Sequence, residues 1–280
     1  MKRIMFVILA TALLSACTTK QSQQSDQSQQ PKQPKMLVLY YSQEGTTQKV
    51  AEEIAAQTGA DIERIDATDP YSGNFDETIQ RCRKEREAGV SPTVNPIQAD
   101  LSQYDVVFLG YPIWFGTYAP PMEVLLKEID LDGKTVVPFC TFGSGGLQSS
   151  VADLRKAQPK ADIREGFGIR TARIGNLKPE LERFLILSGY KEGEVEQYPD
   201  YSAQAPVTDE HAAIFDAACS GYQFPLGKPV TVGIRETSTS TDYCFTAEGT
   251  DRDGNVSQST IYVTVSKTAG AKPEFTMVVR

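Results

Sequence analysis

The sequence predicts a doubly wound α/β domain, and two observations support this fold class. Short apolar runs alternate with segments of helical periodicity through residues 36–195. Such alternation is typical of a parallel sheet with helices on both faces, because parallel neighbours must be joined by a crossover. Several of the apolar runs are also nearly continuous, as expected for strands that are buried on both faces.

Five strands and five helices are expected in this domain. The expected strands are 36–41, 61–67, 104–111, 135–141 and 163–170. The expected helices are 47–57, 75–88, 122–129, 147–157 and 178–188. Ligands of doubly wound sheets bind outside the carboxyl ends of the strands, near the point where the strand order reverses. The loops after the first, third and fourth strands are therefore the expected place of a site.

The loop after the first expected strand has the composition of a phosphate-binding turn. Residues 42–47 read SQEGTT and stand directly between an apolar run and a helix. Hydroxyl residues and a glycine let backbone N–H groups approach a phosphate, and the following helix N-terminus adds donors and partial positive charge. No lysine follows as in a P-loop, so a phosphate monoester fits better than a nucleoside triphosphate. An ordinary helix N-cap at Thr46 or Thr47 is the alternative.

The loop after the third expected strand contains the only tryptophan of the chain, Trp114. Residues 110–121 read GYPIWFGTYAPP, so prolines and glycines surround the aromatic side chains. Because a buried helix or strand does not place Pro and Gly so close around a tryptophan, we expect a loop here. Its aromatic side chains suit stacking on a planar heteroaromatic ring. A hydrophobic plug over the edge of the sheet is the alternative.

The loop after the fourth expected strand, residues 141–146, reads TFGSGG. Its three glycines permit backbone amides to lie flat against a ligand, and a linker without a ligand is the alternative. Cys140 directly precedes this loop. A nucleophilic role for Cys140 needs a base, and the only histidine, His211, lies outside the domain, so we expect a structural role.

In this order and spacing, the three loops resemble the FMN-binding loops of the flavodoxin superfamily. They are most similar to flavodoxin-like proteins whose second loop reads Pro-x-Trp, followed by Gly and a Pro-rich helix start. The resemblance covers about residues 36–195. It implies a flavodoxin-like parallel sheet with strand order 2-1-3-4-5 and FMN as the cofactor.

The resemblance also implies a role for each loop residue. The residues implied to hold the FMN phosphate are Ser42, Glu44 (through its backbone N–H), Gly45, Thr46 and Thr47. Those implied to line the isoalloxazine, with Trp114 against its face, are Pro112, Ile113, Trp114, Phe115 and Gly116. Those implied to close the pyrimidine and ribityl side are Thr141, Phe142, Gly143 and Gly146. The first loop departs from the family pattern, because Gln43 and Glu44 stand where many flavodoxins have a hydroxyl residue.

The domain has no residues suited to catalysis by themselves, so a bound flavin is expected to perform the reaction. The sequence offers no histidine–acid pair and no nucleophile beside a base, and the cysteine spacings match no metal motif, so neither catalytic side chains nor a metal are expected. The leading hypothesis is electron transfer through bound FMN. The alternatives are a flavin-dependent NAD(P)H:quinone-type or azo-compound reductase and a non-catalytic binding lipoprotein on the same scaffold.

The first 17 residues have the pattern of an export signal. Lys2 and Arg3 precede a short apolar stretch, residues 4–14, that is too short to span a bilayer. Residues 14–17 read LSAC, which resembles the bacterial lipobox and implies a lipid on Cys17; a plain secretory signal is the alternative. Residues 18–35 are polar and expected to be a flexible tether. Thr18 after the cysteine favours the outer membrane, on either its periplasmic or its surface face.

The net charge of the chain is −8 with a pI near 4.9, which makes nucleic acid an unfavourable partner. The hydrophobic fraction of 40% is enough for a packed core. An acidic surface suits docking on basic patches. The expected partners are a redox protein or a small electron acceptor, and the membrane through the lipid.

The C-terminal segment, residues 207–280, matches no family by its residues and is expected to be small and mainly β. A polar linker, 196–206, and a helix, 209–218, precede strands expected at 229–235, 243–247, 259–265 and 274–279. Asp253 and Gly254 predict a hairpin turn rather than a calcium loop. Cys219 and Cys244 could form a disulfide or remain free thiols, and His211 is expected to be a surface or packing residue.

Overall fold

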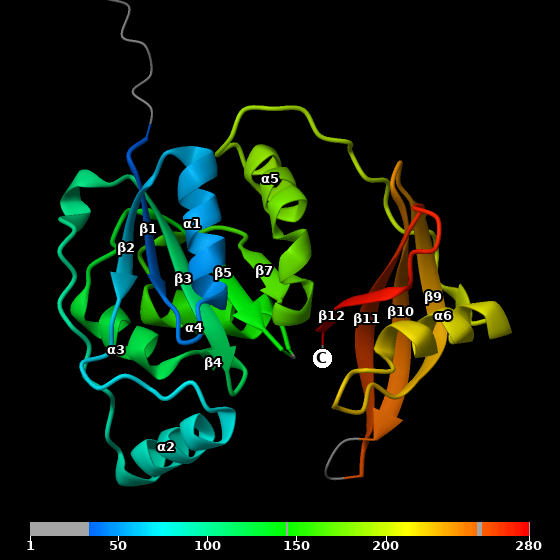
Figure 1. The fold of residues 1–280 in the computed structure, drawn as a ribbon, viewed down its shortest axis with the longest axis horizontal. Coiled ribbons are helices and arrows are strands. Elements are labelled where there is room, and N and C mark those ends of the chain that lie inside the picture. Colours follow the sequence, from blue (N-terminus) through cyan, green and yellow to red (C-terminus); the bar gives the residue numbers. More distant parts are fainter. Residues whose placement is uncertain (1–33, 144, 251–253, 280) are drawn as a thin grey trace, which may run out of the picture. The chain divides into compact units, whose positions relative to one another are not determined.

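The computed structural model describes residues 34–143, 145–250 and 254–279. Its larger sheet contains β1 (Met36–Tyr41), β2 (Asp61–Ile65), β3 (Val106–Trp114), β5 (Thr135–Phe142), β6 (Asp162–Ile163) and β7 (Phe167–Arg170). These strands are parallel and lie in the order β2-β1-β3-β5-β6, with β7 also paired to β5 (Figure 1). The predicted order 2-1-3-4-5 is confirmed, because β6 and β7 together form the fifth expected strand.

The interruption of the fifth strand has a cause in its neighbour. β6 pairs with β5 as far as Val136, and β7 resumes the pairing at Phe139. Pro138 lies between these two points and has no N–H to donate to the adjacent strand. A Cβ built at Gly166 would lie 2.2 Å from the Pro138 carbonyl oxygen, so the backbones approach closely where the ladder is broken.

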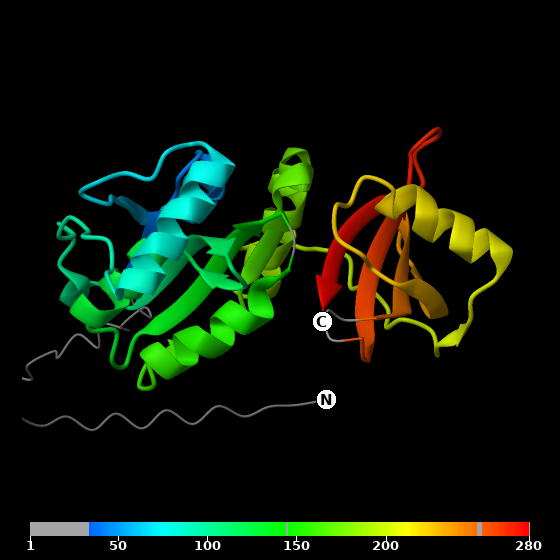
Figure 2. The same ribbon diagram turned by 90° about the horizontal axis from the view of Figure 1, so that it is seen from below.

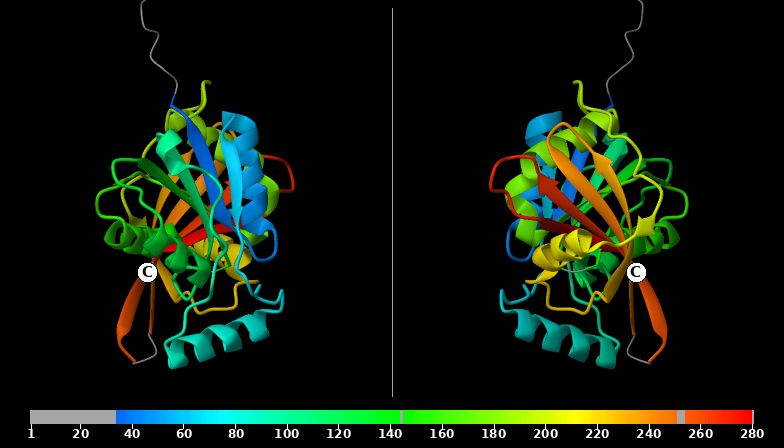
Figure 3. Two further views of the ribbon diagram at one scale, coloured as in Figure 1. Left: turned by 90° about the vertical axis from the view of Figure 1, so that its left-hand side faces the viewer. Right: turned by 90° about the vertical axis from the view of Figure 1, so that its right-hand side faces the viewer.

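Helices cover both faces of the larger sheet (Figures 1 and 2). α1 (Thr46–Thr58) and α5 (Leu177–Leu187) share a core with Val38 and Tyr40, whereas α3 (Pro120–Glu128) and α4 (Leu147–Ala157) share one with Leu37 and Leu39. These alternate residues of β1 point to opposite faces, and all four are buried. α2 (Phe75–Ala88), drawn in cyan in Figure 3, lies beyond the ends of the strands and covers neither face.

The segment expected to be the second loop is partly a β-hairpin, so that expectation is wrong. β3 continues to Trp114 and pairs with β4 (Thr117–Tyr118) in an antiparallel manner. Phe115 (φ 52°) and Gly116 (φ 86°) form the turn, and two successive positive φ values are typical of a tight hairpin. Pro112 fits in the strand because β1 pairs with β3 only as far as Gly110, so no neighbour on that side needs its N–H.

A second sheet is formed by β8 (Ala205–Pro206), β9 (Lys228–Glu236), β10 (Ser240–Thr250), β11 (Val256–Ser266) and β12 (Glu274–Val279). The pairing is antiparallel throughout, in the order β12-β11-β10-β9-β8, which confirms the mainly-β expectation. α6 (Asp209–Cys219) packs on it through Phe215, whose ring lies 5.3 Å from that of Phe245. We call residues 205–279 the β-module.

Cys219 and Cys244 are free thiols in the β-module, so the disulfide alternative is not realised. Gly254 has φ 85°, as a hairpin turn needs, but Asp253 lies outside the described residues. The predicted signal peptide, the lipidation site Cys17 and nearly all of the tether also lie outside them. Across the described ranges, no helix has the length and apolar character needed to cross a membrane.

Candidate functional site

The first loop places an uncapped helix N-terminus at the carboxyl end of β1. Gly45 occupies the N-cap position of α1 with φ 84°, and no side chain caps the helix. The alternative of an N-cap at Thr46 or Thr47 is therefore not realised. Ser42 is buried, and its Oγ accepts a hydrogen bond of 3.1 Å from the Gly45 N–H, which shapes the turn. The first amides of α1 thus have no side-chain acceptor, a condition that suits an anion.

Arg64, which lies outside the loop in the sequence, supports the loop and supplies a cation beside it. Its Nη2 donates to the Ser42 carbonyl oxygen at 2.8 Å, and its Nε pairs with Asp66 at 2.8 Å. β1 and β2 run parallel with Tyr40 opposite Arg64, and this register brings the guanidinium beside the end of β1. Arg64 could have been anticipated from the predicted strand order, because the ends of neighbouring parallel strands meet.

The two residues that depart from the family pattern have separate roles. Gln43 donates through Nε2 to the Ser72 carbonyl oxygen and, at 2.7 Å, to Thr78 Oγ1 of α2. It therefore fastens the first loop to the segment that carries α2. Glu44 is exposed, so its carboxylate can remain in water while its backbone N–H belongs to the loop.

A pair of threonine hydroxyls connects the first loop to the third. Thr47 Oγ1 in α1 and Thr141 Oγ1 in β5 lie 2.8 Å apart, and both residues are buried. Two buried hydroxyls satisfy one another here, and removing one leaves the other without a partner. The structure thus brings together two predicted site residues that are 94 positions apart in the sequence.

Trp114 is enclosed by tyrosines from two other segments. Its ring meets Tyr41 of β1 edge-on at 6.1 Å and Tyr71 at 5.1 Å between ring centroids. Tyr71 is itself fixed, because its hydroxyl donates to Glu85 Oε2 at 2.6 Å. Burial, followed by the nearby Glu85, raises the pKa of Tyr71 far above its ordinary value, so the phenol stays protonated.

Phe115 is the exposed aromatic side chain of the second loop, with 49% of its surface accessible. It stands at the tip of the hairpin turn, and the Arg86 guanidinium of α2 lies 5.0 Å from its ring centroid. A partly buried Trp114 and an exposed Phe115 are both available to line an aromatic ligand. The sequence analysis predicted that both residues line the isoalloxazine, with Trp114 against its face.

The third loop presents backbone groups at the end of β5. Phe142 is buried in the core beneath the sheet, with 3% exposure, so only its backbone can face a ligand. The Gly143 carbonyl oxygen accepts a 3.2 Å hydrogen bond from Nε of Arg170 at the end of β7. Cys140 is fully buried, and this burial raises the pKa of its thiol strongly, which keeps it protonated and unreactive.

The space around the three loops allows a ligand to approach the backbone. A Cβ built at Gly45, Gly116 or Gly143 would meet no atom within 4 Å. Each loop also has an arginine from outside it, and these are Arg64, Arg86 and Arg170. Open backbone and cationic side chains are the features that an anionic, planar cofactor such as FMN requires. The predicted residues therefore fit FMN, although their individual contacts with it remain a prediction.

Within the described residues, no group of three or more His, Cys, Asp or Glu side chains is placed so that it could hold a metal ion.

Comparison with known proteins gives a match to one family. The family model for flavodoxin matches residues 35–178, which is just over half of the chain. A comparison with curated proteins found no match. The β-module lies outside the matched residues.

Several solved structures resemble the chain over the same region. A protein from Bacteroides eggerthii, provisionally named a flavoprotein, is 30% identical, with a TM-score of 0.46; the match covers 54% of this chain and 97% of that one. A similarly named protein from Bacteroides uniformis is 24% identical, with a TM-score of 0.47 and coverages of 53% and 98%. A flavoprotein from Lactobacillus acidophilus, solved in complex with FMN, is 21% identical, with a TM-score of 0.43 and coverages of 48% and 93%.

Proposed function

The chain belongs to the flavodoxin family, and from this premise we propose that it is an electron carrier that works through bound FMN. Membership of the family supports FMN as the cofactor. The observation that carries the proposal is the convergence of the first and third loops through the Thr47–Thr141 hydroxyl pair, with open backbone on both sides of it. Bound FMN would supply one- or two-electron transfer.

The residues of the chain divide the work of holding FMN. The uncapped first turn of α1, beginning with the amide of Thr46, receives the phosphate, with Arg64 adding positive charge behind Ser42. The hairpin with Trp114 and Phe115 provides the aromatic wall. This arrangement positions a cofactor and excludes water from one side of it.

A carrier is favoured over a reductase by the chemistry of the site. A flavin-dependent NAD(P)H:quinone-type reductase needs a second pocket for its substrate over the flavin. Phe115, at the tip of the hairpin, is 49% exposed, so this edge of the site is open to a docking partner. We therefore assign the exchange of electrons to a partner protein or a small acceptor at the exposed edge of the hairpin. Rapid oxidation of NADH or NADPH by the loaded protein would reverse this assignment.

We further propose that the protein works in the bacterial cell envelope, anchored by a lipid on Cys17. The support is the charged, apolar and LSAC pattern of residues 1–17, followed by a polar tether. A net charge of −8 suits a partner with a basic surface and disfavours nucleic acid. Incorporation of labelled fatty acid that is lost in Cys17→Ser tests the anchor. Label retained in that variant would disprove it.

Titration of the soluble chain, beginning at Lys20, with FMN tests the central claim. We expect saturable quenching of flavin fluorescence at one FMN per chain. Trp114→Ala should weaken binding by about 1–3 kcal/mol, because a large aromatic contact is lost. Phe224→Ala, which removes an aromatic side chain of the β-module with 47% exposure, serves as the control and should bind normally. Absence of binding by the folded chain would favour a non-catalytic binding lipoprotein.

A further inference from the structure

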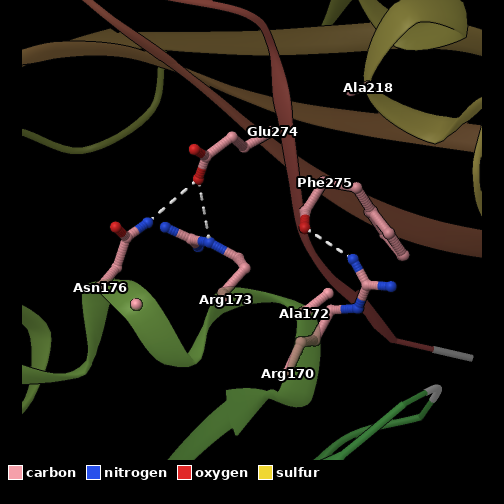
Figure 4. Close-up of a pocket in the computed structure, with 8 residues that line it drawn as sticks. Arg170, Ala172, Arg173, Asn176, Ala218, Glu274 and Phe275 are labelled. Atoms are coloured by element: carbon pink, nitrogen blue, oxygen red, sulfur yellow. Dashed lines mark hydrogen bonds and ion pairs between the residues drawn. The ribbon is translucent and has the colours of Figure 1, made fainter.

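Arg170 lies where the third loop, β7 and the β-module meet. Its Nε donates to the Gly143 carbonyl oxygen at 3.2 Å, and its Nη1 donates to the Phe275 carbonyl oxygen of β12 at 2.9 Å. The guanidinium also lies 4.2 Å from the centroid of the Phe275 ring and 5.5 Å from that of Tyr222. One rigid, planar group thus connects a backbone group of the FMN site to the β-module. Figure 4 shows the contact with Phe275.

The charge of Arg170 is not neutralised by a neighbouring acid. Its partners are two carbonyl oxygens and two aromatic rings, and in the described ranges no carboxylate forms an ion pair with it. Burial lowers the pKa of Arg170 below its ordinary value, although the guanidinium remains protonated near neutral pH. Hydrogen bonds from a half-buried cation to a carbonyl group are stronger than neutral ones.

A second set of contacts fixes β12 beside Arg170. Glu274, the residue before Phe275, accepts from Asn176 Nδ2 at 3.1 Å and pairs with Arg173 at 3.3 Å. Arg173 and Asn176 belong to the 3₁₀ helix Thr171–Asn176, which directly follows Arg170 in the chain. Figure 4 shows both contacts, with Glu274 pointing from β12 toward the two side chains.

The same strand reaches the end of the third loop. A Cβ built at Gly146 would lie 3.7 Å from the Val278 carbonyl oxygen and 3.9 Å from the Met277 sulfur. β12 therefore borders the third loop at Gly146 and contacts Arg170 at Phe275. The hollow of about 280 Å³ between Arg170, Arg173 and β12 is lined by polar groups that mostly bind one another, so it does not present a ligand site of its own.

We propose that the β-module holds the third FMN loop in place through Arg170 and thereby slows the release of FMN. The effect on release rests on the proposed function, whereas the effect on the loop does not. β12 fixes the guanidinium, and the guanidinium fixes Gly143, so Arg170 is a positioning residue. The β-module, which lies outside the region that matches the flavodoxin family, thus contributes to the flavin site by supporting one of its loops.

The test follows amide hydrogen exchange in the full chain without FMN, purified in detergent. In Arg170→Ala, we expect exchange in peptides from residues 139–149 to rise about tenfold, because a charge-assisted hydrogen bond of roughly 1.5 kcal/mol is lost. Peptides that contain residues 42–47 should keep their rates. Glu274→Ala frees β12 without touching Gly143, and it should raise the same exchange by a smaller factor.

Arg183→Ala is the matched control. Arg183 also contacts a carbonyl oxygen, that of Glu196, and an aromatic ring, that of Tyr198, but it has no contact with an FMN loop. It should leave exchange at residues 139–149 unchanged. Unchanged exchange there in both Arg170→Ala and Glu274→Ala, or an equal rise in Arg183→Ala, would overturn the proposal.

A second measurement follows the release of FMN from the loaded chain and the visible circular dichroism of the bound flavin. Arg170→Ala should release FMN about tenfold faster and alter the dichroism, whereas Arg183→Ala should do neither. Faster loop exchange with unchanged release would disprove the role in retention. Failure of the unaltered chain to bind FMN would refute the proposed function alone, because the exchange result is obtained without flavin.

Discussion

The first and third loops of the site present backbone groups to the same region, but they are supported from different parts of the chain. The first loop is shaped by Ser42 and by Arg64 of the neighbouring strand, both inside the region that matches the flavodoxin family. The third loop is supported by Arg170, whose second hydrogen bond goes to Phe275, far outside that region. The proposed phosphate side of the site is thus supported from within the family domain, whereas the proposed support of the other side reaches the β-module.

The difference suggests a way in which an appended module acts on a site without altering the core of the fold that carries it. The sheet and its four covering helices form two closed apolar cores. The β-module has a third core of its own around Phe245. The contacts between the family domain and the β-module at the sheet edge are mainly polar. Replacing one side chain there, such as Arg170, should therefore alter the support of the third loop with little loss of core packing.

The largest effect is expected where the two loops are joined. Thr47→Val removes one hydroxyl of the buried pair and leaves Thr141 unsatisfied, so the free energy of unfolding should fall by about 1–3 kcal/mol. Urea unfolding of the ligand-free chain measures this. Thr46→Val, at the adjacent threonine outside the pair, is the control. The double variant Thr47→Val/Thr141→Val should lose less than the sum of the single losses, and additive losses would show that the hydroxyls do not interact.

A smaller effect is expected at the first loop. Arg64→Gln removes a partly exposed cation and its bond to the Ser42 carbonyl group, which should weaken FMN binding about two- to fivefold. Riboflavin, which lacks the phosphate, should bind the variant and the unaltered chain equally. Equal losses for both ligands in a fluorescence titration would mean that Arg64 shapes the loop instead of attracting the phosphate.

The smallest effect is expected at Glu44. Its carboxylate is exposed and repels the phosphate only through water, so Glu44→Gln should strengthen FMN binding by about twofold or less. The gain should disappear at high salt, because exposed charges are screened. A gain that persists at high salt, or a loss of affinity in Glu44→Gln, would show that the side chain itself contacts the ligand.

Much of the fold could be predicted from the sequence because burial leaves a periodic pattern. The continuous apolar run 36–41 became β1, and the alternation at 259–265 lies within β11. Gly110, expected at the end of a strand where the second loop begins, lies inside β3 opposite Phe139, whose ring atoms would come within 2.0 Å of a Cβ there. A glycine required by packing and one required by a turn look alike in a sequence.

The supporting arginines could not be predicted in the same way. Neither residue stands in a motif: Arg64 reaches its loop only when β2 pairs with β1, which the predicted strand order implies, whereas Arg170 reaches β12 only when the β-module is present. The hairpin at Phe115 was missed because Pro and Gly signal a break in a strand more often than its continuation. Pairing on only one side of Pro112 is a tertiary condition that no local pattern records.

The environment of Trp114 gives the protein a built-in optical probe. Trp114 is the only tryptophan of the chain, and it lies edge-on to Tyr41 and Tyr71 on the wall of the site. Near-ultraviolet light absorbed by these tyrosines can pass to the indole by resonance transfer, so its emission reports on one known place. The wavelength and lifetime of that emission would follow the packing of the site without any label, because the β-module has no tryptophan of its own.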